Sequence, residues 1–277
     1  VYAGWFGKII GVRHGAELEN WSSEKIKEKF GDIDSYLFDY KNFAADDDIN
    51  GPVFFQRVFE DYNYQNIGYN EMGLTWLNYI PDEHGFFWWG GYGVSTEHTA
   101  YLNLKHGILP PRSGSEIQNG EIISEEIGGQ IFSDCWGLIF PNEPEKAAEY
   151  AKKMSSISHD NNGVYGGQFI ASMISQAFGK EKILNIIEKS LDIIKSDSEY
   201  AEMVKDIVNF YKHYPNNWRK CLSYVKNNYN YTNYLGKVPI IPNGAIIILA
   251  LLYSNRNFSK GINIANMCGW DTDCNVG

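Results

Sequence analysis

The sequence predicts an all-α protein built as an orthogonal helical bundle. Segments 182–195, 198–211 and 218–227 place charged residues on one helical face and isoleucine, leucine and valine on the other, a spacing typical of amphipathic helices. Residues 245–253 are apolar on all sides, which indicates a helix buried at the centre. The sequence shows no strong alternation of apolar and polar residues and no internal repeat, so neither a sheet nor a repeat protein is expected.

The first helix is expected over residues 2–12 and is expected to be buried. Gly4, Gly7 and Gly11 recur at spacings of three and four, and they would let this helix pack very closely against its neighbours. A phosphate-binding loop is the weaker interpretation of these glycines, because no strand precedes them and the Gly-Lys-Ser/Thr step is missing.

Further helices follow, with capping residues or apolar spacing typical of a helix. Pro52 and Pro144 are each placed in a first helical turn, where a missing N–H costs nothing. Residues 32–43 and 237–244 are expected to be irregular. The remaining helices are expected at 22–30, 50–62, 69–79, 94–105, 125–139, 142–157, 168–178 and 260–267.

Composition narrows the class of protein. The 277 residues contain no Pro/Gly/Ser-rich linker, so a single domain over residues 1–277 is expected. With 24 basic and 34 acidic residues the net charge is −10, which argues against a nucleic-acid duplex as partner. The longest apolar run is well short of the roughly 20 residues that cross a bilayer, so no membrane partner is expected. Four cysteines in no zinc or disulfide framework favour a reducing, cytoplasmic compartment.

Two acidic clusters carry the strongest chemical signal. Asp46, Asp47 and Asp48 are consecutive, and their mutual repulsion requires a cation or a helix dipole nearby. Asp271 and Asp273 form a second cluster near the end of the chain. If the fold brings both together, the site is rich in oxygen ligands without a Cys/His array, and suits magnesium, manganese or calcium. Capping of a helix N-terminus is the alternative for the first cluster.

Four short motifs resemble those of the ADP-ribosylglycohydrolase family. Asp46-Asp47-Asp48-Ile49 resembles the family's Thr-Asp-Asp-Thr motif, and residues 269–274 resemble its C-terminal Gly-Gly-Asp-Thr-Asp-Thr motif. Residues 4–11, followed by residues 15–19, resemble the family's opening helix, which ends in a Gly-Ala-x-x-Glu pattern. Residues 158–160 are similar to its Thr/Ser-His step before a helix. The motifs follow the family's order and span almost the whole chain, from residue 4 to residue 274.

Three positions depart from the family pattern. Asp46, Ile49 and Cys274 stand where the family has threonine. The loss of two hydroxyl groups and the gain of a carboxylate would alter the charge of a metal site. These changes are expected to affect which linkage is cleaved more than whether a metal ion binds.

The resemblance implies a bundle of the ADP-ribosylglycohydrolase type and a metal-dependent hydrolase that cleaves an N- or O-glycosidic bond to an ADP-ribosyl group. The substrate would be an ADP-ribosylated protein or small molecule, and the cofactor one or two Mg²⁺ ions, with Mn²⁺ as a substitute. Glu19, Asp48 and Asp273 would carry catalysis. The expected metal ligands are Asp46, Asp47, Asp48, Asp271 and Asp273.

Aromatic and glycine-rich stretches are candidates for holding the rest of the substrate. Residues 84–93 could form a stacking platform with N–H groups open to a pyrophosphate, or a packed aromatic corner. His159 could donate a hydrogen bond into the pocket or be a satisfied core histidine, and a triad of residues 158–160 is disfavoured because sequence neighbours rarely face one another. The residues expected to contact substrate are Gly91, Tyr92, Gly128, Gly129, His159 and Trp270.

Two other functions remain open. A metal-independent glycoside hydrolase on an α/α scaffold would use two carboxylates, and would stay active in EDTA. A non-catalytic ADP-ribose-binding or structural relative would bind the ligand without releasing product, since the substitutions at 46, 49 and 274 could have disabled catalysis.

Overall fold

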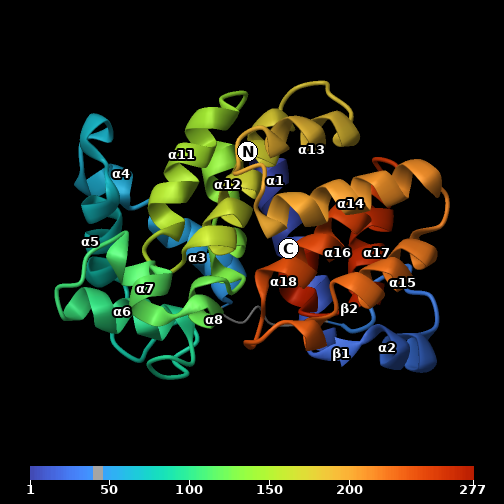
Figure 1. Ribbon diagram of the computed structural model, residues 1–277, viewed down its shortest axis with the longest axis horizontal. Helices are drawn as coiled ribbons and strands as arrows, with labels where there is room; N and C mark the ends of the chain where they lie inside the picture. The colour runs from blue at the N-terminus through green and yellow to red at the C-terminus, as the bar shows by residue number, and fades with distance from the viewer. Residues whose placement is uncertain (40–45) are drawn as a thin grey trace. The chain divides into compact units, whose positions relative to one another are not determined.

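Helices account for almost all of the regular structure in the computed structural model, which describes residues 1–39 and 46–277 (Figure 1). Within that part of the chain, strands are limited to two segments of two residues each. The predicted all-α class is therefore confirmed. Internal contacts group the chain into two units: Val1–Ala44, Lys182–Asn185 and Glu199–Gly277 form the first unit, and Ala45–Glu181 and Ile186–Ser198 the second.

In the first unit, the long apolar helix α16 (Ile240–Tyr253) is the centre of the core. Its side chains are buried nearly all round, as its apolar composition predicts. Helices α14, α15 and α17 pack against it. The helices and strands of this unit are α1 (Tyr2–Gly15), η1 (Ala16–Leu18), β1 (Trp21–Ser22), α2 (Ser23–Phe30), α14 (Glu199–His213), α15 (Trp218–Asn228), η4 (Tyr231–Asn233), α16, α17 (Phe258–Cys268), β2 (Gly269–Trp270) and α18 (Thr272–Val276).

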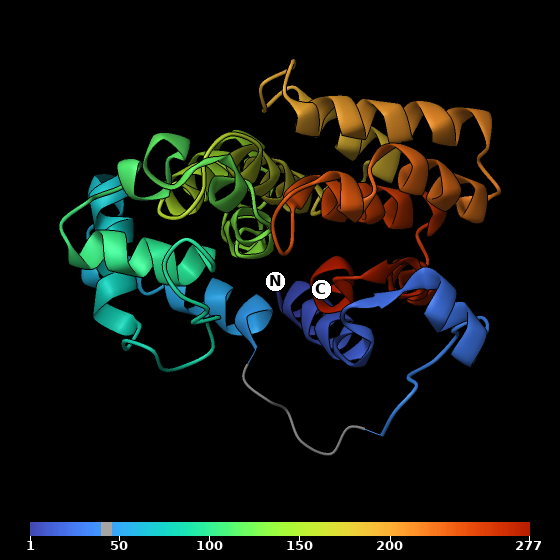
Figure 2. The same cartoon turned by 60° about the horizontal axis from the view of Figure 1, so that its bottom comes forward.

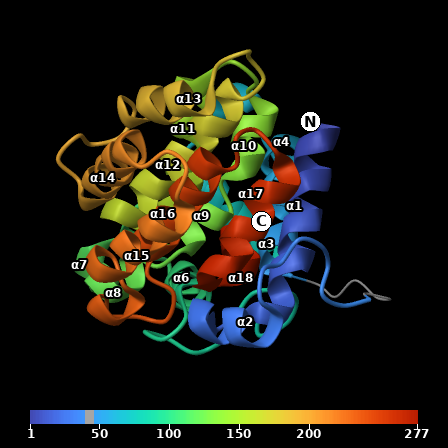
Figure 3. The same ribbon diagram turned by 90° about the vertical axis from the view of Figure 1, so that its right-hand side faces the viewer.

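Helix α1 packs closely along the C-terminal helix α18 (Figures 2 and 3). A Cβ atom at Gly11 would lie 2.2 Å from the carbonyl oxygen of Val276, and one at Gly15 would lie 2.1 Å from that of Thr272. Only glycine allows this approach, so the predicted role of the glycine spacing is confirmed at Gly11. The prediction of a buried first helix holds for its C-terminal half only, because Tyr2 is exposed on its first turn.

The second unit is built around an aromatic core. Phe55, Trp76 and Phe132 are fully buried, and Phe87 stacks on Trp76 with ring centroids 4.9 Å apart. The helices α11 and α12 form the most extensive pair in this unit. Its elements are α3 (Asp47–Phe55), α4 (Val58–Asp61), η2 (Tyr64–Asn66), α5 (Tyr69–Tyr79), α6 (Thr96–Lys105), η3 (Arg112–Gly114), α7 (Glu116–Asn119), α8 (Glu121–Ser124), α9 (Gly128–Ile131), α10 (Asp134–Ile139), α11 (Pro144–Ser155), α12 (Asn161–Gln176) and most of α13 (Ile183–Leu191).

Two expected helices are interrupted. The segment predicted at 50–62 forms α3 and α4, and Pro52 lies inside α3 rather than in its first turn, because Asp46 caps the helix several residues earlier. The segment predicted at 125–139 forms α9 and α10. Between them, the hydroxyl of Ser133 donates to the carbonyl of Gly129 at 2.6 Å and competes with the helical hydrogen bonds.

Two other helices begin earlier than predicted. Helix α12 begins at Asn161 rather than 168, because the Asp160 side chain accepts a hydrogen bond from its first N–H group. The glycines in its first turns allow close packing, since a Cβ atom at Gly163 would lie 2.4 Å from the carbonyl oxygen of Ser124. Helix α16 includes residues 240–244 of the predicted connector, because Pro242 falls in its first turn, where no N–H group is needed.

Other boundaries agree with the predictions within a few residues, and α5 agrees at both ends. Residues 32–39 contain no helix or strand, and the rest of the predicted irregular segment, 40–43, lies outside the described residues. None of the helices in the described ranges is both long and apolar enough to cross a membrane.

Candidate metal and substrate site

Three carboxylates lie together in the first unit. Glu19, Asp271 and Asp273 each offer an oxygen atom within 4.8 Å of the others. Asp271 is buried directly after β2, Asp273 is half-buried in α18, and Glu19 is exposed after the short helix η1. The sequence reasoning selected all three residues, and the structure brings them together.

The short β ladder explains how residues so far apart in the sequence meet. Strand β1 begins two residues after Glu19, and β2 ends one residue before Asp271. The strands are antiparallel, with Trp21 opposite Trp270, and the N–H of Asn20 donates to the carbonyl of Trp270 at 2.6 Å. This register fixes the backbone that follows Glu19 and the backbone that precedes Asp271.

The pKa of the Asp271 carboxyl is strongly raised. Burial raises the pKa of its carboxyl well above the usual range, and the negative charges of Asp273 and Glu19 raise it further. The Asn243 amide donates to its Oδ2 at 3.2 Å. A divalent cation would reverse this balance by favouring the ionised carboxylates.

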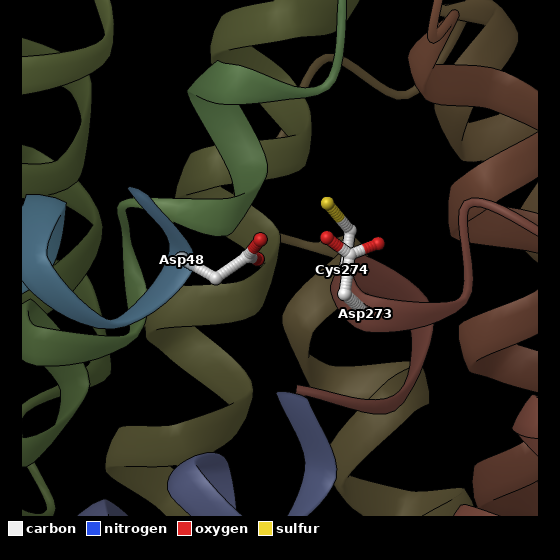
Figure 4. Close-up of side chains that lie close together, drawn as sticks. All are labelled: Asp48, Asp273 and Cys274. Carbon is white, nitrogen blue, oxygen red and sulfur yellow. The ribbon is translucent and has the colours of Figure 1, made fainter. Parts of the chain in front are cut away.

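The donor set fits a hard cation. Three carboxylate oxygens within reach of one ion are the ligands that Mg²⁺, Mn²⁺ and Ca²⁺ take, whereas zinc sites are built from cysteine and histidine. Cys274, the residue after Asp273, is half-buried on α18, where Figure 4 labels both side chains.

The other acidic cluster begins helix α3 in the second unit. Asp46 is the N-cap of this helix, and its Oδ1 accepts a hydrogen bond from the N–H of Asp48 at 3.0 Å. Asp48, also labelled in Figure 4, is buried, with 1% of its surface exposed. Oxygens of Asp46, Asp47 and Asp48 lie within 4.8 Å of one another. The cluster therefore caps a helix and also forms a second group of potential ligands.

The aromatic–glycine stretch combines both interpretations of its sequence. Phe87 is buried in the aromatic core, whereas Tyr92 is 54% exposed. The N–H of Gly91 donates to Nδ1 of His98 at 3.1 Å, and that of Gly93 donates to Thr99. These two N–H groups are therefore occupied within the protein, and the exposed side chains of Trp88 and Tyr92 are groups of this stretch that can stack on a ligand.

His159 is held inside the second unit. Its Nε2 accepts a hydrogen bond from the N–H of Gly129 at 3.1 Å, and its Nδ1 lies 2.7 Å from the hydroxyl of Ser158. Burial lowers the pKa of His159 to about 3, so the ring is neutral. Gly128 and Gly129 are buried against this ring. These contacts are those of a satisfied core histidine, and Asp160 makes no triad because it caps α12.

Trp270 has an unusual backbone conformation. Its φ angle is 70°, which is rare for a residue with a side chain. The half-buried indole stacks on the ring of Tyr231, with centroids 5.0 Å apart. Trp270 therefore lies directly before the carboxylates, with one ring face occupied by Tyr231.

Sequence reasoning missed several buried polar residues. Asn243 is fully buried beside Asp271, although its sequence context predicts a connector. Glu97 and Glu126 are buried acids in the second unit, and burial and the charge of Glu126 raise the pKa of Glu97 to about 7. No spacing in the sequence marks these residues: Glu97 and Glu126 lie in ordinary helical pattern, and Asn243 lies in a segment expected to be irregular.

These features define the class of the protein: it is a helical protein with groups of carboxylates suited to binding a divalent cation. The chain belongs to the ADP-ribosylglycohydrolase family, whose family model matches residues 1–276. The family consists of glycohydrolases that act on ADP-ribosylated substrates and are generally metal-dependent. A search among curated proteins finds no match.

Proposed function

We propose that this protein is a Mg²⁺-dependent hydrolase that cleaves an N- or O-glycosidic bond to an ADP-ribosyl group on a protein or small molecule. The observation that carries the proposal is the grouping of Glu19, Asp271 and Asp273 within 4.8 Å in a chain that matches this family over residues 1–276. Mn²⁺ would serve as a substitute for Mg²⁺.

The proposed ligands are the carboxylates of both acidic clusters. Each cluster supports the proposed metal binding because its hard oxygen donors lie close together and carry an excess of negative charge. A bound cation would offset this charge, which otherwise repels the diphosphate of the substrate, and would orient ribose hydroxyls and water at the bond to be cleaved. The ligands are Asp46, Asp47, Asp48, Asp271 and Asp273.

Glu19 would assist proton transfer rather than bind the metal ion as a buried ligand. It is the exposed member of its group and is therefore accessible to substrate and water. A carboxylate that hydrogen-bonds a water or a ribose hydroxyl can assist proton transfer, with a typical contribution of about a hundredfold or more to the rate. Asp48 and Asp273 are proposed to share in catalysis by holding the reacting groups in place.

The other proposed contacts lie on different kinds of surface. The exposed ring of Tyr92, beside Gly91, is suited to stacking on an adenine or sugar ring. Trp270 adjoins the carboxylates and would contact the ribose. Gly128, Gly129 and His159 are the remaining proposed contacts, and they are buried together in the second unit.

The first experiment compares Asp273→Asn with wild type. Asparagine is nearly isosteric but carries no charge, so this variant is expected to lose at least tenfold in Mn²⁺ affinity by calorimetry and to lose turnover of ADP-ribosylated arginine, serine and small-molecule substrates. Glu202→Gln, which neutralises an exposed acid on α14 of the same unit, is the matched control and should behave as wild type. Circular dichroism checks that both variants are folded.

Other outcomes identify the two competing functions. Retained turnover in Asp273→Asn would remove the assignment. Full activity after EDTA treatment would favour a metal-independent glycoside hydrolase. Tight binding of ADP-ribose with no product over hours, for every substrate tested, would favour a non-catalytic reader.

A further inference from the structure

We propose that Asn243 is the positioning residue that orients Asp271 for binding the divalent cation, a role that rests on the proposed metal-dependent function. Asn243 is fully buried on α16, and its Nδ2 lies 3.2 Å from Oδ2 of Asp271. An amide inside an otherwise apolar helix is costly unless it is satisfied, so its placement beside a buried carboxylate requires an explanation.

The second hydrogen of the same amino group is also used. Nδ2 of Asn243 donates to Oδ1 of Asn275 at 2.5 Å. Asn275 in turn donates its own Nδ2 to the carbonyl of Gly269 at 3.1 Å. The orientation of the Asn243 amide is therefore fixed, because an exchanged oxygen would face two acceptors.

These bonds tie Asp271 to three elements at once. Asn243 belongs to α16, Asn275 to α18 and Gly269 to β2. Since α16 is the buried centre of its unit, it provides a rigid base for the carboxylate. With one oxygen held by the amide, rotation of the Asp271 carboxylate about its χ2 angle is restricted.

An amide suits this position better than an ionisable group. The amino group of an amide donates hydrogen bonds at any pH and has no charge that would repel a cation, so it can hold Oδ2 of Asp271 in one direction. A hydrogen-bonded residue behind a metal-binding carboxylate typically changes metal affinity or activity by about 10–100-fold when it is removed. Loss of the Asn243 donor should therefore weaken metal binding through the orientation of Asp271.

The test measures metal affinity separately from stability. Asn243→Ala removes the donors and leaves a space, and Asn243→Leu removes the donors but keeps most of the volume, so that at least one variant is expected to fold. Asn266→Ala and Asn266→Leu are the matched controls: Asn266 is also fully buried in the same unit, but its Nδ2 donates to the backbone carbonyl of His14. Thermal unfolding by circular dichroism and Mn²⁺ titration by calorimetry are recorded for each.

We expect both Asn243 variants to bind Mn²⁺ at least tenfold more weakly than wild type, and the Asn266 variants to bind within about twofold of wild type even where their melting temperatures fall equally. Wild-type affinity in a folded Asn243 variant would overturn the role of Asn243 alone. An equal loss in the Asn266 variants would also overturn it, because the effect would then follow stability. Absence of saturable Mn²⁺ binding in wild type would instead overturn the proposed function.

Discussion

Trp21 lies opposite Trp270 in an antiparallel ladder of only two residues per strand. This pairing connects the segment after Glu19 with the segment before Asp271, which are about 250 residues apart in the sequence. The ladder is short, so its contribution to overall stability is small. Its importance lies in the register, which sets the two carboxylate-bearing segments side by side.

The first prediction concerns Gly269, which opens β2 with a φ angle of 80°. In Gly269→Ala the new methyl group would have an unfavourable backbone conformation and would lie 2.6 Å from the carbonyl oxygen of Trp21. We expect a loss of about 3 kcal/mol in the free energy of unfolding and at least tenfold weaker Mn²⁺ binding. Urea denaturation and calorimetry measure these two effects.

Gly31→Ala is the control for the backbone conformation alone. Gly31 follows α2 with a φ angle of 72°, and a methyl group added there would have no atom within 4 Å. It should lose only about 1–2 kcal/mol and keep its metal affinity. Equal effects in both variants would show that the contact with Trp21 does not matter.

The second prediction concerns the contact between α1 and α18. Gly11→Ala would bring a methyl group 2.2 Å from the carbonyl oxygen of Val276, so the two helices must separate. Overpacking of this kind costs about 1–3 kcal/mol or more. Chemical denaturation should show this loss, with weaker metal binding as a consequence of displacing α18.

Gly7→Ala lies on the same helix and provides the control. Its methyl group would lie 3.5 Å from the Phe258 ring, an ordinary contact distance. Because alanine is a better helix former than glycine, this variant should gain up to about 1 kcal/mol. A destabilised Gly7→Ala would mean that helix propensity and packing are not separable here.

The third prediction separates the two roles of Asp46. Asparagine caps a helix as well as aspartate does, but it removes one negative charge. If Asp46 is a metal ligand, Asp46→Asn should weaken Mn²⁺ binding at least tenfold with little loss of stability. Asp46→Ala should show the same weakening and also lose about 1 kcal/mol, because the hydrogen bond to the N–H of Asp48 is gone. Unchanged binding in Asp46→Asn would leave Asp46 with the capping role alone.

The fourth prediction concerns the pH dependence of stability. The pKa of Glu97 is raised from 4.5 to about 7, chiefly by burial. The folded state therefore keeps a proton that the unfolded state has released, so the contribution of Glu97 to stability should fall as pH rises from about 4.5 to about 7. His159 contributes in the opposite direction up to about pH 6.5, because its pKa is lowered in the folded state. The contribution of Glu97 is at most about 3 kcal/mol.

Glu97→Gln isolates this contribution: the free energy of unfolding of wild type minus that of the variant should fall over this pH range, measured by urea denaturation at each pH in the absence of metal. Glu202→Gln removes an exposed acid and should leave the curve unchanged. A difference between the wild-type and Glu97→Gln curves that does not fall between pH 4.5 and 7 would contradict the prediction.

Local sequence was sufficient for the helical class and for most helix boundaries. Helix α5 follows directly from its apolar spacing, and α16 from its continuous apolar run. The errors fell where a side chain acts on the backbone across a short distance. Ser133 interrupts a helix, and Asp160 caps α12 so that this helix begins earlier than predicted.

The sequence by itself predicted the kind of chemistry, because clustered carboxylates repel one another unless a cation or a helix dipole lies nearby. Tertiary structure alone decided that Glu19 joins Asp271 and Asp273, and that Asn243 supports Asp271 from α16. These relationships depend on the pairing of β1 with β2 and on the packing of α16 against α18. Contacts between residues far apart in the sequence leave no local pattern, because they arise from the packing of whole elements.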